Sequence, residues 1–172
     1  KQLIGEQPNR EVLQTKLINL KIELTELHDN FRKILVSNLK NSGKSNYHRK
    51  LLLVFVELVE LLETAIANPV NYNKMDVLFE THPEFKADFQ KLISEFSFQL
   101  RAIANQINNS NKTPSNKVLF IAFKNLELDI LNVKDETKSE DYEHYLMLQN
   151  FLKNKKKQFE KLKKIKWLLG NP

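Results

Sequence analysis

Three carboxylates on one apolar stretch are the first residues that could do chemistry. Glu57, Glu60 and Glu63 are spaced by three within Leu51–Ala67, and paired carboxylates can act as general acid and general base. No histidine, glycine-rich loop or nucleophile motif accompanies them. Because buried charges are normally paired, we expect these glutamates to form a polar strip that pairs with lysine or arginine from a neighbouring helix.

Histidine and cysteine are the other residue types that could hold a metal or attack a substrate. The chain has no cysteine, which excludes thiolate metal sites and cysteine nucleophiles. Two-metal sites in helical bundles use Glu-x-x-His, and no glutamate here has a histidine three residues later. Phosphate-binding glycine loops are also missing. The sequence therefore predicts no cofactor, no metal and no enzymatic activity, and the four histidines read as ordinary surface or capping residues: His28, His48, His82 and His144.

A cluster of lysines lies near the end of the chain. Between Lys153 and Lys166 there are eight lysines and one acid, Glu160, so this segment carries a charge of +7. The net charge of the chain is +6, so the charges of the remaining residues sum to −1. On a helical wheel the apolar residues of the segment cover one face and most lysines the other, although Lys155 and Lys166 fall within the apolar arc. We expect the apolar face to dock and the lysines to face outward. The candidate patch comprises Lys153, Lys155, Lys156, Lys157, Lys161, Lys163, Lys164 and Lys166.

Three interpretations of this patch compete. The first is a solvated helix face, the second a segment held near an anionic membrane surface, and the third a nucleic-acid contact. Nucleic acid is the least favoured, because the segment has no arginine for bidentate phosphate or guanine contacts and no aromatic residues interleaved for base stacking.

Apolar residues at helical spacing define the elements that position these groups. The predicted helices span 9–38, 47–68, 72–80, 84–108, 113–134 and 139–169, with Thr81 and Thr113 capping the fourth and fifth. The first helix carries a regular apolar stripe: Leu13, Leu17, Leu20, Leu24, Leu27, Phe31 and Ile34. No alternation of period two persists, so no sheet is expected. The prediction is an all-α antiparallel bundle of about five long helices and one short helix.

The whole chain, 1–172, is predicted to be one helical domain, with 153–169 as the basic end of its last helix. Its most apolar stretch, Leu51–Ala67, is seventeen residues long and holds three glutamates. A membrane span needs about twenty residues with few charges, so this stretch is predicted to be a core helix. The chain starts without methionine, and we expect it to be a piece excised from a longer protein.

The segment SNYHRKLLLVFVELVELLETAIANPVNYNKMDVLFE resembles the soluble region of YccS-type, fusaric-acid-resistance-like inner-membrane proteins. That region has an arginine, a long apolar helix with acids at regular spacing, a tyrosine, and a short amphipathic stretch ending in phenylalanine. The similarity covers Leu13–Asn108 and weakens from Thr113 onward. The matching positions are Arg49, Glu57, Glu60, Tyr72 and Phe79.

The resemblance implies a setting rather than a site. Such proteins have two transmembrane bundles with a cytoplasmic helical region between them, and are thought to act in efflux or transport. The chain would then lie at the cytoplasmic face of the bacterial inner membrane, within an integral membrane protein. Its partners would be the transmembrane segments of the same parent chain, an anionic membrane surface beside the lysines, and further copies of itself in a homo-oligomer.

The family supplies no catalytic or ligand residue to carry onto this sequence. The resemblance therefore implies a structural, gating or oligomerisation role without catalysis. The alternative is a freestanding helical interaction module that binds an acidic protein or nucleic acid through Lys153–Lys166.

Overall fold

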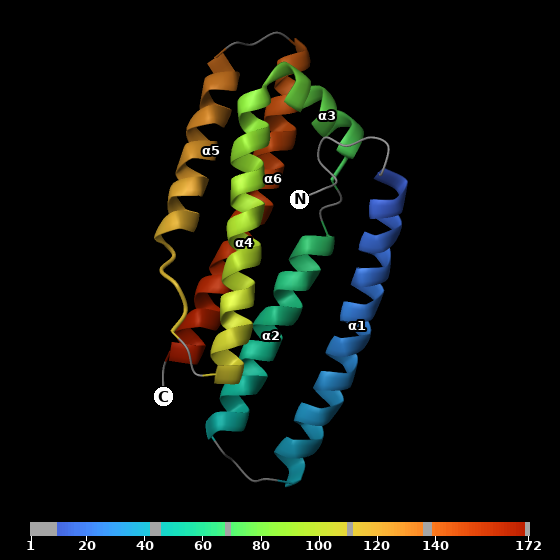
Figure 1. Cartoon of the computed structure of the whole chain (residues 1–172), viewed down its shortest axis with the longest axis vertical. Coiled ribbons are helices and arrows are strands. Elements are labelled where there is room, and N and C mark those ends of the chain that lie inside the picture. Colours follow the sequence, from blue (N-terminus) through green and yellow to red (C-terminus); the bar gives the residue numbers. More distant parts are fainter. Residues whose placement is uncertain (1–9, 42–45, 68–69, 110–111, 136–138, 171–172) are drawn as a thin grey trace.

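A computed structural model describes residues 10–41, 46–67, 70–109, 112–135 and 139–170. Throughout these ranges the chain is helical or irregular, with no strand, which confirms the predicted all-α bundle of five long helices and one short one (Figure 1). The helices are α1 (Arg10–Asn41), α2 (Asn46–Ile66), α3 (Tyr72–Thr81), α4 (Pro83–Asn109), α5 (Lys117–Asp135) and α6 (Ser139–Gly170).

The buried core lies between α4, α5 and α6, with α2 packed along α6 and α3 packed on α4. Its centre is aromatic. The ring of Phe89 lies 5.6 Å from that of Phe79 and 4.5 Å from that of Phe151, and Phe123 stacks on Phe159 at 5.2 Å. Apolar residues every three or four positions place these rings on one side of each helix.

Two helix starts differ from the sequence-based expectation. Thr81 is the last residue of α3, where its hydroxyl donates to the Val77 carbonyl at 2.9 Å, so it does not cap α4. Instead His82 separates the helices, and its carbonyl accepts from the Phe85 N–H at 3.2 Å. The fifth helix begins at Lys117 rather than at Thr113, because tertiary contacts described below hold the segment before it in a non-helical conformation.

The first helix is an outlying element that runs beside α2 at the edge of the molecule (Figure 1). It reaches α3 through Arg10, which donates to Asn73 at 2.9 Å and pairs with Asp76. Along α2, the rings of His28 and Phe31 pack on Phe55 at 5.7 and 5.4 Å.

The packing of α1 covers only part of its predicted apolar stripe. The line that faces the protein follows Gln14, Lys21, His28 and Leu35, each half-buried or buried. Each of these residues comes one position after a stripe residue, so the covered side is rotated by about 80° from the centre of the stripe. The outer stripe residues stay 40–63% exposed: Leu20, Leu24, Leu27, Phe31 and Ile34.

Candidate functional site

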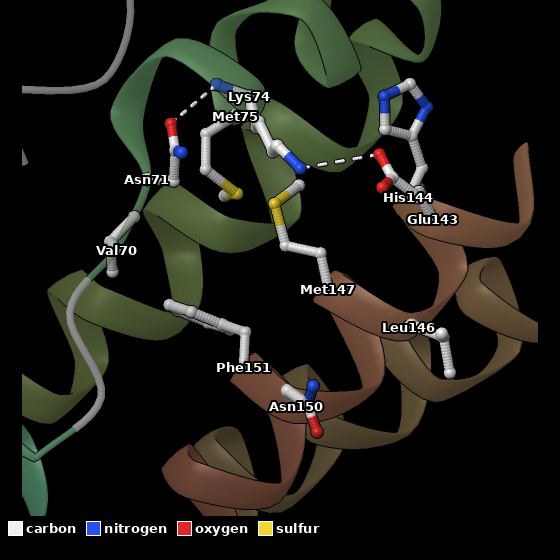
Figure 2. Close-up of a pocket in the computed structure, with 10 residues that line it drawn as sticks. All are labelled: Val70, Asn71, Lys74, Met75, Glu143, His144, Leu146, Met147, Asn150 and Phe151. Carbon is white, nitrogen blue, oxygen red and sulfur yellow. Dashed lines mark hydrogen bonds and ion pairs between the residues drawn. The ribbon is translucent and has the colours of Figure 1, made fainter. Parts of the chain in front are cut away.

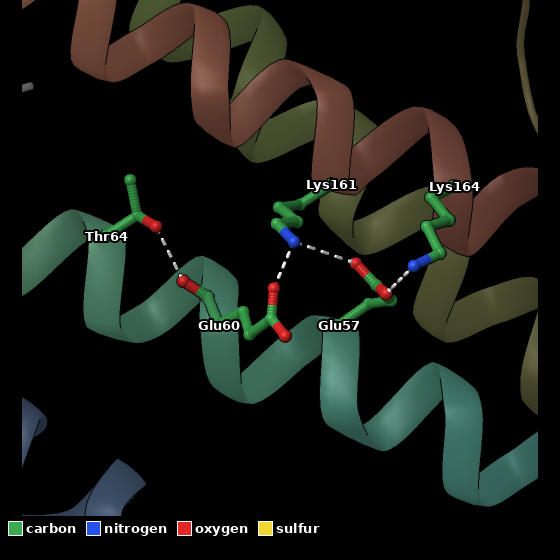
Figure 3. Close-up of polar contacts among 5 residues, drawn as sticks. All are labelled: Glu57, Glu60, Thr64, Lys161 and Lys164. Carbon is green, nitrogen blue, oxygen red and sulfur yellow. Dashed lines mark hydrogen bonds and ion pairs between the residues drawn. The ribbon is translucent and has the colours of Figure 1, made fainter.

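The predicted glutamates and the predicted lysines meet in one place, between α2 and α6. Glu57 is only 4% exposed, and its carboxylate pairs with Lys164 and lies 3.4 Å from the ammonium of Lys161. Lys161 pairs in turn with Glu60 (Figure 3). We call Glu57, Glu60, Lys161 and Lys164 the α2–α6 seam. The prediction that the glutamates pair with basic residues of a neighbouring helix is confirmed for Glu57 and Glu60.

The third glutamate does not join the seam. Glu63 is exposed and forms no ion pair with any residue in the described ranges. Instead a polar contact extends the seam: Asn154 of α6 donates to the Thr64 carbonyl at 2.8 Å, and the Thr64 hydroxyl donates to the Glu60 carbonyl at 2.7 Å.

The electrostatics of the seam favour fixed charges. The hydrogen bond and the charge of Lys161 lower the pKa of Glu60, and the same hydrogen bond raises the pKa of Lys161. Both groups are therefore held ionised at neutral pH, whereas a general acid or base needs a pKa close to the working pH. The arrangement is suited to joining two helices rather than to moving protons.

Two of the other lysines of the predicted patch also pair with acids. Lys156 pairs with Glu127 of α5, and Lys163 pairs with Glu160 of its own helix at 2.6 Å. Only Lys153 and Lys157 are exposed without an ion pair or hydrogen bond to a described residue. Lys153, Lys156, Lys157 and Lys164 are exposed, as expected for lysines that face outward, but several lysines of the patch also pair with acids of α2, α5 and α6.

The two lysines that fall within the apolar arc, Lys155 and Lys166, point inward. The ammonium of Lys155 lies 5.9 Å from the ring centre of Phe96 and 5.4 Å from that of Phe151, and donates to Gln158 at 3.0 Å. Burial lowers the pKa of Lys155 to about 8. The rings supply a cation–π contact that partly replaces water.

Lys166 ties α6 to the segment between α4 and α5. Its ammonium donates to Gln99 at 2.8 Å, to Asn116 at 2.5 Å and to the Pro114 carbonyl. Burial lowers the pKa of Lys166. Because Pro114 and Asn116 are held by this contact, α5 starts at Lys117, where the backbone N–H also bonds the Ser115 hydroxyl at 3.1 Å.

The remaining positions of the family resemblance lie apart from the seam. Phe79 is 6% exposed and belongs to the aromatic core. Tyr72 is half-buried at the start of α3, and burial raises its pKa. Arg49 is exposed near the start of α2. Of the five family-like positions, the structure brings together only Glu57 and Glu60.

A cavity of about 380 Å³ lies between the start of α3 and α6 (Figure 2). Met75, Met147 and Phe151 provide an apolar wall, and at the rim Lys74 pairs with Glu143 at 3.4 Å. The Nδ1 atom of His144 is buried and has no hydrogen-bond partner among the described residues. The volume suits a small organic molecule. Sequence reasoning missed this site because its two sides are about seventy residues apart and share no motif.

A pair of aspartates, Asp88 on α4 and Asp129 on α5, includes a carboxyl group with a raised pKa. Burial, a hydrogen bond with the Asp88 carboxyl, and repulsion from Asp88 and Glu84 raise the pKa of Asp129 to about 6. Folding therefore favours the protonated acid, and the stability of the protein falls as pH rises from about 4, the unfolded pKa, to about 6.

Replacing Asp129 with asparagine should remove this penalty. We expect Asp129→Asn to raise the free energy of unfolding at pH 7 by about 1 kcal/mol, since partial solvent screening reduces the full effect of the shift. The gain should fade below pH 4. Urea unfolding of both proteins between pH 4 and 8 measures it, with Asp29→Asn, an exposed aspartate on α1, as the control. An equal gain at every pH would contradict the assignment.

Within the described ranges no group of three or more histidines, aspartates or glutamates is arranged to hold a metal ion. No helix in those ranges is long and apolar enough to cross a membrane. No curated protein and no solved structure matches the chain. The family model for the FUSC-like inner membrane protein yccS matches residues 5–168. With nearly its whole length matched, the chain belongs to the FUSC-like family of inner-membrane proteins.

Proposed function

We propose that this chain is the cytoplasmic helical domain of a FUSC-like efflux or transport protein, and that it has no catalysis of its own. It lies at the inner face of the bacterial inner membrane and supports the membrane-embedded part of the parent chain by bracing, gating or oligomerisation. The family match over residues 5–168 supports the membrane setting.

One observation carries the structural role: α6 uses its lysines to join α2, α4 and α5 into one body. The α2–α6 seam joins α2, Lys156 joins α5, and Lys166 joins α4 and the segment that precedes α5. A rigid body of this kind can hold or move the segments attached to it, which a set of loosely packed helices cannot.

An anionic membrane surface remains the proposed neighbour of the basic end. Its contribution is limited, because four acids offset about half of the lysine charge: Glu57, Glu60, Glu127 and Glu160. Lys153 and Lys157 are the residues best placed to meet lipid headgroups.

The test breaks and then repairs the seam in the parent membrane protein. Lys161→Met with Lys164→Met leaves the buried Glu57 without a partner, and adding Glu57→Leu replaces the pair with apolar contacts. If the domain braces the membrane part, the double variant should assemble less and export less, and the triple variant should regain both. Native gels measure assembly, and growth in the presence of compounds that the intact parent exports measures export.

Two results would count against the proposal. Normal assembly and export by the double variant would mean that the rigidity of this domain does not matter to the parent. Failure of the triple variant after its stability has recovered would mean that the charged groups act directly, on substrate or lipid. Each variant also carries a single cysteine in place of Lys153. If this cysteine is labelled only in inverted vesicles, the domain stays at the cytoplasmic face.

The alternative, a freestanding module that binds an acidic protein or nucleic acid, has less support. Most of the lysines that would contact such a partner already have partners within the protein. It would require binding to duplex DNA that weakens steeply with salt.

A further inference from the structure

The exposed side of α1 is a feature that the proposed function does not use. Its five outer stripe residues are 51%, 40%, 63%, 44% and 55% exposed, in the order Leu20, Leu24, Leu27, Phe31 and Ile34. Single exposed apolar residues are ordinary on a protein surface, but a contiguous row of them marks an interaction site.

The spacing of this row indicates what kind of partner would cover it. Its members alternate in steps of three and four from Leu17 to Ile34, which is the pattern of a coiled-coil seam. A seam of this kind accepts another helix, whose side chains enter the spaces between its own. The row is turned by roughly 80° around the helix from the line that packs on the protein, and Phe31 of the row also packs on Phe55 of α2. A second helix therefore approaches from the side of Leu20 and Leu27, which are 51% and 63% exposed.

We infer that the partner is the α1 helix of a second copy of this chain, packed antiparallel in a two-fold symmetric dimer. This deepens the structural role proposed above and rests on it for its meaning in the parent protein. When two such helices pack antiparallel, a row residue that follows a step of four faces a row residue of the other helix that follows a step of three. The two copies then pair Leu24 with Leu27, Leu17 with Ile34, and Phe31 with Leu20.

Charges beside the row are compatible with this self-pairing. Its outer edge carries Lys16, Glu23, Asn30 and Ser37 at spacing seven. Antiparallel packing places Lys16 opposite Ser37 and Glu23 opposite Asn30 of the second copy, so no like charges face each other. A helix that lies on anionic lipid is instead flanked by lysine and arginine, whereas this edge carries both signs.

The size of the row sets the strength of the contact. A helix of 32 residues is about 48 Å long and about 10 Å wide, so covering one side of it on both copies removes on the order of 1,000 Å². This is near the lower limit for specific interfaces. We therefore expect a reversible dimer with a dissociation constant on the order of 10 µM for the chain alone.

The test uses two matched double variants of the whole chain. Leu20→Gln with Leu27→Gln alters side chains that are 51% and 63% exposed, and Leu131→Gln with Leu128→Gln alters α5 side chains that are 51% and 60% exposed. Sedimentation equilibrium should show the α1 variant dimerising at least tenfold more weakly than the unaltered chain. The α5 variant should dimerise like the unaltered chain.

Orientation is tested with single cysteines, because the chain has none of its own. In the antiparallel dimer the two copies of residue 27 are offset by about 5 Å along the helix, and those of residue 34 by about 25 Å. A short bismaleimide should therefore cross-link Leu27→Cys to itself and leave Ile34→Cys monomeric.

Each other outcome rejects the inference. A chain that stays monomeric up to about 200 µM, well above the expected dissociation constant, has no such dimer. Equal weakening by the two double variants would place the contact elsewhere, and equal cross-linking at residues 27 and 34 would indicate parallel helices. A monomer that binds vesicles of phosphatidylcholine and phosphatidylglycerol through Leu20 and Leu27 would show that lipid is the partner. None of these results bears on the α2–α6 seam variants of the parent protein, so the two proposals fail separately.

Discussion

Lys161→Met combined with Lys164→Met is expected to lower the free energy of unfolding by about 2 kcal/mol. The change leaves the Glu57 carboxylate, 4% exposed, without a cation. Removing one side of a fully buried pair costs about 3–5 kcal/mol, and the smaller figure applies here because both lysines retain contact with water. Urea unfolding followed by circular dichroism measures the loss.

Urea unfolding of a variant with a third substitution separates the contribution of the ion pair from the cost of leaving the Glu57 carboxylate unpaired. Adding Glu57→Leu should restore most of the lost stability, because replacing a buried ion pair with apolar residues is often neutral. The control, Lys153→Met with Lys157→Met, removes two lysines that have no partner in the described ranges and should change stability by less than about 0.5 kcal/mol. A control as damaging as the seam variant would show that net charge, not pairing, is responsible.

Phe89→Ala should have the largest effect of any change considered, a loss of about 4 kcal/mol. The ring is fully buried and lies between Phe79 of α3 and Phe151 of α6. Truncation loses the transfer free energy of the ring and leaves a space that these neighbours cannot fill completely. The midpoint of urea unfolding should move accordingly, with no change in slope.

Phe98→Ala provides the comparison on the same helix. Phe98 is 54% exposed, so its truncation should alter stability by less than about 0.5 kcal/mol. Similar losses for the two alanine variants would mean that the aromatic centre between α3, α4 and α6 is not the core of the protein. A loss below about 1.5 kcal/mol at Phe89 would indicate that the surrounding helices collapse into the space.

Local pattern accounts for the helices themselves. Apolar residues every three or four positions, broken by Pro69, Pro83 and the asparagine-rich loops, are enough to predict six helices within about four residues of their observed ends. The same helical wheel placed Lys155 and Lys166 within the apolar arc, and in the structure both ammonium groups lie against core helices. Helix formation depends on side chains three and four positions apart, so a single segment contains most of the necessary information.

The misplaced start of α5 has a different origin. Thr113 has the residue type and the following proline of a helix start, yet α5 begins at Lys117. The ammonium that holds Pro114 and Asn116 belongs to Lys166, about fifty residues later. Local capping energies of about 1 kcal/mol are readily outweighed by such a contact, which no local pattern reveals.

The sequence by itself determined that this chain forms amphipathic helices, that the glutamates of Leu51–Ala67 need basic partners, and that it resembles an inner-membrane family. Only the tertiary structure decided which lysines those partners are, because Glu57 and Lys161 are about a hundred residues apart. It also decided that α1 turns Gln14, Lys21 and His28 toward the protein and leaves Leu20 and Leu27 exposed. A helix's periodicity specifies an apolar face, but the number and position of its neighbours determine how much of that face is covered.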